Sequence, residues 1–195
     1  MKKEQSMETI ENIQSDLKKM LSEKRYQHSI GVMKKAEELA KQYGVDPHIA
    51  ALTGLAHDIG KEISNEEKIE YCKEHQIEID EIEIHNVGLL HAKIGADITK
   101  KYGFTEEMQK AILYHTTGHL DMDLLAKIVF AADKIEENRE YEGVEELRKL
   151  AMQDIDQCTL VILDYTIKKN IDKGVLIHPD GIFARNQLLP LSLQQ

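Results

Sequence analysis

Several histidines and aspartates stand where the surrounding sequence is apolar. Their neighbours form short runs such as GLAHDIG, GLLHAKIG and FAADKIE, which predict burial. A buried charge is costly unless it is paired, so these side chains need a partner. Neutral imidazoles and carboxylates are ligands of mid-row divalent metals, and a bound cation would neutralise the aspartates. The set that fits one such site is His28, His57, Asp58, His91, His115 and Asp133.

The adjacent pair His57 and Asp58 restricts where this site can lie. Neighbouring residues of a helix point about 100° apart, so both side chains reach one ion only from the end of a helix. Gly60 follows two residues later and favours such an end. The simpler interpretation of any single histidine is a core or surface residue. We leave outside the metal set the histidines with more polar or turn-like neighbours, namely His48, His75, His85, His119 and His178.

Three cationic side chains follow or precede this set closely. Arg25 lies three positions before His28 and shares its helix face, Lys61 lies three after Asp58, and Arg139 lies six after Asp133. Cations around a metal form a pocket for a polyphosphate, and an arginine can bind it bidentately. The simpler interpretation is a solvated surface charge for each cation, and a salt bridge to Lys134 or Lys127 for Asp133.

The elements that must position these residues are predicted to be helices. Apolar residues recur at helical spacing, Pro47 follows Asp46 as at a helix start, and Ser64 with Glu67 forms a capping box. No run of alternating strands is present. The expected fold is a single all-α domain over residues 1–195, with a core at about 20–173 and an irregular segment at 174–195. The expected helices cover residues 10–21, 22–44, 46–60, 64–75, 87–103, 105–118, 122–139 and 143–170.

Composition excludes several classes of protein. The chain has 195 residues, 42% of them hydrophobic and 31% charged, as in an ordinary globular domain. Its net charge of −10 argues against binding to a nucleic acid. The apolar runs are too short for a membrane span, the N-terminal sequence does not resemble a secretory signal, and Cys72 and Cys158 lack metal-site spacing. We therefore expect a cytoplasmic protein with no membrane partner.

The ordered set of histidines and aspartates resembles the HD-domain metal-dependent phosphohydrolases. An isolated histidine, an HD pair, two further histidines and a late aspartate are the signature of that superfamily, and the sequence is most similar to its bacterial YqeK branch. The resemblance covers about residues 20 to 190. It is carried by the segments RYQHS (25–29), HDIGK (57–61), HAKIGA (91–96), HTTG (115–118), DKIEENR (133–139) and HPDGIFARN (178–186).

The resemblance implies an iron-dependent symmetrical bis(5'-nucleosyl)-tetraphosphatase that cuts diadenosine tetraphosphate into two ADP. The implied metal ligands are His28, His57, Asp58 and Asp133, and the implied catalytic residues are Asp58, Lys61, His91 and His115. It also implies that the C-terminal tail covers the nucleotide. The implied substrate and ADP contacts are Arg25, Lys61, His91, His115, Thr116, Arg139, Leu176, Ile177, His178, Pro179, Asp180 and Gly181.

Several alternatives stay open. We expect one tightly bound ion, with His91 and His115 facing the phosphates, but the two histidines suit a second ion as well. The ligand types fit iron, manganese, cobalt or zinc. The function is alternatively that of a nucleotidase, a deoxynucleotide triphosphohydrolase or a non-catalytic nucleotide sensor. A homodimer is also open.

Overall fold

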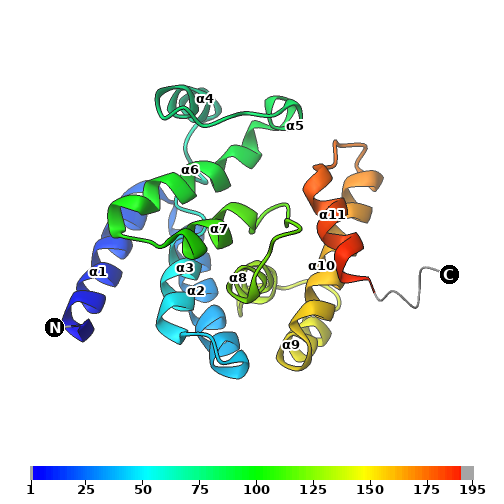
Figure 1. Cartoon of the computed structure of the whole chain (residues 1–195), viewed down its shortest axis with the longest axis horizontal. Helices are drawn as coiled ribbons and strands as arrows, with labels where there is room; N and C mark the ends of the chain where they lie inside the picture. Colours follow the sequence, from blue (N-terminus) through cyan, green and yellow to red (C-terminus); the bar gives the residue numbers. More distant parts are fainter. Residues whose placement is uncertain (1, 190–195) are drawn as a thin grey trace.

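The computed structural model describes the backbone of residues 2–189 and the side chains of residues 10–189. Within these residues it is all-α, as predicted, and contains no strand (Figure 1). None of the described helices is long and apolar enough to cross a bilayer. The helices are α1 Lys2–Met20, α2 Glu23–Tyr43, α3 Pro47–Ala56, α4 Asn65–Glu74, α5 Glu81–His85, α6 Leu90–Ile98, α7 Glu106–Tyr114, α8 Leu124–Ile135, α9 Val144–Gln153, α10 Ile155–Asp172 and α11 Pro179–Leu188, with 3-10 turns η1 Val87–Leu89 and η2 Thr99–Tyr102.

The predicted helix-capping residues lie at the helix ends in the structure. Asp46 caps α3 by accepting hydrogen bonds from the backbone N–H groups of His48 and Ile49, and Pro47 takes the first helical position. Ser64 and Glu67 form the capping box of α4. Gly44 ends α2 in the left-handed conformation, at φ 73°, which glycine adopts without strain. These signals set the ends of the helices that carry the site.

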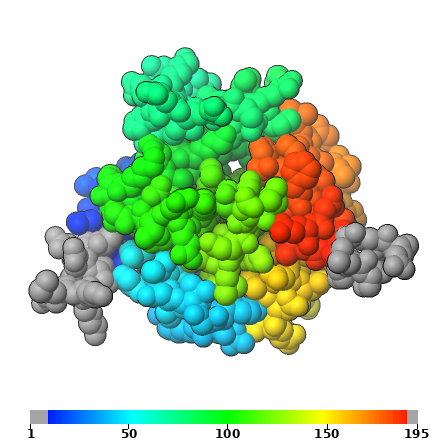
Figure 2. Space-filling model, in the orientation of Figure 1, coloured from blue at the N-terminus to red at the C-terminus, as the bar shows by residue number. Residues whose placement is uncertain are grey.

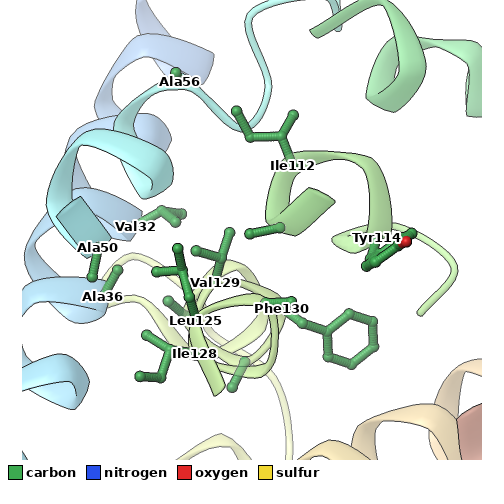
Figure 3. Packing of buried hydrophobic residues seen from close by; sticks show 14 of the residues in the cluster. Val32, Ala36, Ala50, Ala56, Ile112, Tyr114, Leu125, Ile128, Val129 and Phe130 are labelled. Atoms are coloured by element: carbon green, nitrogen blue, oxygen red, sulfur yellow. The ribbon is translucent and has the colours of Figure 1, made fainter. Parts of the chain in front are cut away.

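Helix α8 lies at the centre of the core. It packs against α2, α7 and α10, and α2 packs in turn against α3. Figure 3 shows Leu125 and Val129 of α8 facing Val32 and Ala36 of α2, and all four side chains are buried. The hydrophobic cluster around α8 extends from α1 to α11. Helices α2, α3 and α8, which carry or directly precede His28, His57, Asp58 and Asp133, are thereby held against one another.

The C-terminal segment is more regular than predicted. Residues 179–188 form helix α11, whereas an irregular segment was expected over 174–195. Pro179 stands at the first helical position and the ring of His178 accepts from the backbone N–H of Asp180, so the segment starts a helix that then packs on α10. Ala184 of α11 is buried in the core. Residues 190–195 lie outside the described residues.

Three further segments differ from the predicted elements. The helix expected over 143–170 is divided into α9 and α10 at Asp154, whose extended backbone and side-chain cap start α10. The helix expected over 87–103 is interrupted, because 3-10 turns precede and follow α6. The short helix α5 was not predicted; its capping box is formed by Asp80 and Glu83.

Figure 2 shows an opening between the green segment that includes α6 and α7 and the orange-to-red helices α10 and α11.

Candidate metal centre and nucleotide site

The six predicted residues converge although they come from five helical elements. His28 lies in α2, His57 and Asp58 directly follow α3, and Asp133 lies in α8. His91 is in the first turn of α6 and His115 follows the last residue of α7. All six side chains are buried. The end of α3 at Ala56 matches the helix end that the adjacent pair requires, and Gly60 is needed there because a Cβ would lie 2.8 Å from the carbonyl oxygen of His91.

Four ligand atoms from His28, His57, Asp58 and Asp133 surround one point. His28 Nε2 lies 3.0 Å from Asp133 Oδ1 and 4.0 Å from Asp58 Oδ2. His57 Nε2 lies 3.5 Å from Asp58 Oδ2 and 3.8 Å from Asp133 Oδ1. Ligands bonded to one ion at about 2.1 Å are separated by about 3 to 3.5 Å. Two of the four separations fall in this range and two are longer, and the ligand atoms of His28, His57 and Asp133 lie within 4.8 Å of one another, as do those of His57, Asp58 and His115.

The backbone orients three of the four imidazoles. The Nδ1–H of His57 donates to the carbonyl of Gly54 at 2.7 Å, that of His91 to Gly88 at 2.5 Å, and that of His115 to Ile112 at 2.6 Å. Each bond joins a histidine to the carbonyl three residues earlier. A proton held on Nδ1 leaves Nε2 with a free lone pair, which is the form that ligates a metal.

The fourth imidazole is oriented by a side chain that the sequence analysis missed. His28 Nδ1 lies 3.0 Å from Glu136 Oε1, and Glu136 is 1% exposed. A carboxylate behind a ligating histidine raises its basicity and fixes the ring. Gly31 makes room for this carboxylate, because a Cβ there would lie 2.2 Å from Glu136 Oε2. The sequence did contain a signal, because Gly31 lies three residues after His28 and Glu136 lies three residues after Asp133.

Among the described residues, two buried polar atoms at the centre have no hydrogen-bond partner. They are His57 Nε2 and Asp58 Oδ1, the second of which faces His91 Nε2 at 3.3 Å and His115 Nε2 at 3.5 Å. An unpaired buried polar atom costs about 1–3 kcal/mol, so a cation at this place is stabilising. The donor set and its unpaired atoms fit a divalent metal bound by the first four ligands. A second group of ligand atoms within 4.8 Å of one another, from His57, Asp58 and His115, could also hold a cation.

Lys61 and Thr116 supply hydrogens to the two remaining histidines. Lys61 Nζ lies 3.1 Å from His91 Nε2, and Thr116 Oγ1 lies 3.0 Å from His115 Nε2. His91 Nε2 and His115 Nε2 are 3.1 Å apart. Two lone pairs that face each other at this distance repel, so hydrogen-bond donors such as Lys61 and Thr116, or a cation, stabilise the pair. Lys61 is also 3.6 Å from Asp58 Oδ1.

Burial and charge shift the pKa values of the central groups in opposite directions. Burial raises the pKa of Asp58, but the facing imidazoles of His57, His115 and His91 outweigh it and hold the pKa well below its usual range. Burial lowers the pKa of His115 to about 4 and also lowers that of His91. Asp58, His91 and His115 are therefore in the protonation states that a metal requires. At His28 burial lowers the pKa, but the hydrogen bonds with Asp133 and Glu136 outweigh it and raise the pKa above its usual value, so a metal must displace a proton from this ring.

The predicted cations lie against the carboxylates. Arg25 Nη1 is 3.0 Å from Asp58 Oδ2, and Arg139 Nη2 is 2.7 Å from Asp133 Oδ1. Lys134, which was considered only as a salt-bridge partner, does pair with Asp133 at 2.6 Å. Lys127 pairs instead with Asp156. Since Arg25, Lys61, Lys134 and Arg139 are all partly exposed, their charges lie between the buried centre and solvent.

The predicted nucleotide-covering segment lies next to this centre. A pocket of about 260 Å³, the tail pocket, is lined by residues that include Thr116, Lys134, Leu176, Ile177, His178 and Gly181. His178 Nε2 contacts Asp80 Oδ2 at 2.9 Å, which ties the tail to the residue preceding α5. Pro179 and Asp180 are the first residues of α11, and Asp180 lines a neighbouring pocket with His178.

Comparisons with known proteins agree with these residues. Residues 25–138 match the HD domain family. The chain is 39% identical to a symmetrical bis(5'-nucleosyl)-tetraphosphatase of Halalkalibacterium halodurans, over 89% of this chain and 93% of that protein, and 34% identical to one of Bacillus subtilis, over 89% and 94%. A crystal structure of a predicted HD superfamily hydrolase involved in NAD metabolism from Clostridium acetobutylicum superimposes with a TM-score of 0.89 at 43% identity, covering 92% of this chain and 96% of that one. The chain therefore belongs to the HD domain family, whose members bind divalent metals through histidine and aspartate residues of this kind.

Proposed function

We propose that the protein hydrolyses diadenosine tetraphosphate symmetrically to two ADP. The observation that carries the proposal is the buried cluster of four ligand atoms, with His57 Nε2 and Asp58 Oδ1 unpartnered, bordered by four cations. A closed structural metal site would need no such border of charge. The relatives that match most of this chain carry that activity in their names.

We infer that His28, His57, Asp58 and Asp133 hold one divalent ion, and that the ion is iron. Support comes from the separations of 3.0 to 4.0 Å among their ligand atoms. When bound, such an ion lowers the pKa of a coordinated water and polarises a phosphoryl oxygen. Mixed nitrogen and oxygen ligands suit manganese, cobalt and zinc as well, so metal analysis of protein purified without a chelator tests the identity.

The chain's own residues then direct the attack of water. Asp58 Oδ1 can accept a hydrogen bond from the attacking water, because it makes no hydrogen bond within the described residues. The water oxygen bonds to one of the two central phosphorus atoms while the bridging P–O bond breaks, and the bridging oxygen leaves with the other ADP. Arg25, Lys61 and Arg139 balance the negative charge that grows on the leaving group.

His91 and His115 have a role that depends on the substrate. Both are neutral before the substrate arrives, since burial lowers their pKa values. A polyphosphate placed beside their Nε2 atoms raises those pKa values, so each ring can gain a proton on binding and then hydrogen-bond a phosphate oxygen or protonate the leaving ADP. Thr116 lies 3.1 Å from His91 and 3.0 Å from His115, where its hydroxyl can reach the same phosphate. The alternative is that His91 and His115 ligate a second ion.

The tail completes the site in this proposal. The residues that contact the nucleotide of one ADP half are Leu176, Ile177, His178, Pro179, Asp180 and Gly181. Support comes from the tail pocket, which Leu176, Ile177, His178 and Gly181 line, and from the neighbouring pocket, which Asp180 lines. The continuity of the hydrophobic cluster from α1 to α11 supports a single domain. A bacterial, cytoplasmic location and a homodimer stay predictions; light scattering tests the second.

Product analysis tests the function directly. Metal-loaded protein should release ADP as the only nucleotide from diadenosine tetraphosphate. Monophosphate as a product would favour the nucleotidase alternative, inorganic tripolyphosphate from a deoxynucleoside triphosphate would favour the triphosphohydrolase, and binding without turnover would favour a sensor. Asp58→Ala should lose bound metal and turnover together; a variant that keeps both at the wild-type level contradicts the site assignment.

A further inference from the structure

A second pocket opens beside the proposed metal ligands. This pocket, the tyrosine pocket, has a volume of about 470 Å³ and is lined by residues that include Lys134, Arg139, Tyr141, Tyr165, Lys169 and Lys173. Small-molecule sites commonly have about 300–1,000 Å³. The pocket is thus large enough for a nucleoside, and the proposed reaction assigns it no role so far.

The tyrosine pocket and the tail pocket are adjacent, and one residue that they share pairs with a proposed metal ligand. Lys134, Thr166 and Asn170 line both pockets. Lys134 Nζ donates to Asp133 Oδ2 at 2.6 Å, and Arg139 Nη2 donates to Asp133 Oδ1 at 2.7 Å. A molecule with its middle at Asp133 can therefore extend into both pockets from the same point.

Charge separates these two pockets from the rest of the described surface. The chain has a net charge of −10, and the pockets around Asp80, Asp97 and Asp156 are all lined in part by carboxylates. No acidic side chain is among the described residues that line the tyrosine pocket or the tail pocket. The two pockets thus suit the two ends of one polyanion.

The tyrosine pocket also offers aromatic surface for a base. The rings of Tyr141 and Tyr165 are nearly parallel, with an interplanar angle of 16° and centroids 6.3 Å apart. The Tyr141 hydroxyl donates to the carbonyl of Lys134 at 2.8 Å, which fixes that ring. Tyr165 is 55% exposed and so has an open face, and Lys169 Nζ lies 5.7 Å from its centroid. Bases stack on such rings without sequence preference.

We propose that the tyrosine pocket binds the second nucleoside of a dinucleoside tetraphosphate while the first nucleoside occupies the tail pocket. This inference rests on the proposed function. It explains how a cut at the central phosphoanhydride yields equal products, because each nucleoside has its own pocket and the two pockets share Lys134, which pairs with the proposed metal ligand Asp133. Lys169 and Lys173 then neutralise the phosphate attached to the second nucleoside.

The variant Tyr165→Ala tests the proposal with diadenosine tetraphosphate and inorganic tripolyphosphate as probes. Loss of one base–aromatic stack should raise the KM for diadenosine tetraphosphate about five- to tenfold. The inhibition constant of tripolyphosphate, which has no base, should stay at the wild-type value. Phe183→Ala is the matched control, since Phe183 is 53% exposed and lines neither pocket; its KM should not change.

Two outcomes would overturn the proposal. One is an unchanged KM for diadenosine tetraphosphate in Tyr165→Ala, and the other is an equal weakening of the substrate and of tripolyphosphate. If the metal-loaded wild-type protein does not cleave diadenosine tetraphosphate, the proposed function fails separately. The pocket is then tested by calorimetric titration with ADP: two ADP per wild-type chain and one per Tyr165→Ala chain support it, and one in both overturns it.

Discussion

Substitution of Gly31 by alanine should weaken metal binding although residue 31 lies outside the ligand set. The new Cβ would lie 2.2 Å from Glu136 Oε2 and 2.9 Å from its Cδ. Unbonded carbon and oxygen atoms need about 3.3 Å or more, so the carboxylate must move by about 1 Å. Such a shift breaks the 3.0 Å contact between Glu136 Oε1 and His28 Nδ1.

The expected magnitude follows from the role of that contact. Loss of a partner behind a ligating histidine weakens metal affinity about 10- to 100-fold, which is about 1.4–2.7 kcal/mol. Folding of the metal-free protein should change differently, because alanine in a helix interior is favoured over glycine by about 1 kcal/mol. Stability of the metal-free chain can thus stay level while metal affinity falls, which separates this mechanism from general unfolding.

Competition with a fluorescent chelator measures the affinity, and thermal unfolding of the metal-free protein measures stability. Glu136→Asp should restore part of the affinity in the Gly31→Ala background, because the shorter side chain relieves the contact. Glu137→Gln is the control, since Glu137 is exposed and pairs with Lys35 instead. Wild-type metal affinity in Gly31→Ala would refute the assignment of Glu136 to His28.

Three further predictions concern charge. Lys61→Ala and Arg139→Ala should keep the metal but raise the KM for diadenosine tetraphosphate about tenfold, as for loss of one charged contact; metal loss with normal nucleotide affinity, read by elemental analysis and titration, would reverse these roles. His91→Ala should leave about one metal ion per chain and reduce turnover. An anomalous-scattering map of wild-type crystals that shows two fully occupied ions, with both His91 and His115 bonded to the second, would reject that view. Hydrogen bonds from Tyr102 and then Lys101 lower the pKa of Asp16 from 3.8 to about 2. The stabilisation by ionised Asp16 is therefore fully present above the pKa of the unfolded state and is lost as the pH falls toward 2. Because Asp16 is one-third exposed, we expect this stabilisation to be less than about 1 kcal/mol. The Asp16→Asn variant should lack it, which acid unfolding of the variant and the wild type measures.

The sequence predicted the parts of the fold that have local causes. The capping residues at Asp46 and Ser64 and the glycine at 44 each act within a few residues of their own position, so the helix ends near them were predictable. Helix α11 was not predicted although Pro179 marks its start, because the turn residues Pro179, Asp180 and Gly181 also fit a loop and the burial of Ala184 and the packing on α10 are long-range.

The candidate site divides in the same way. Residue types and apolar surroundings identified the six central residues, and the structure brings their side chains together. Glu136 was missed because its partner His28 is 108 positions away, and Lys134 was undervalued because a lysine beside an aspartate is common on helices. The tyrosine pocket joins residues 134–147 to 162–173 and has no signature in either segment alone.

The bonds that orient the histidines have a consequence for mutational robustness. His57, His91 and His115 are held by carbonyl oxygens of the main chain, which every amino acid supplies, so the acceptors do not depend on the type of side chain at Gly88 or Ile112. At Gly54 packing adds a limit, because a Cβ would lie 3.1 Å from the carbonyl oxygen of Val32. His28 instead depends on one carboxylate and on one glycine that admits it. Substitutions that disable this centre without replacing a metal ligand are therefore most readily found at Gly31 in α2 and at Glu136, which follows α8.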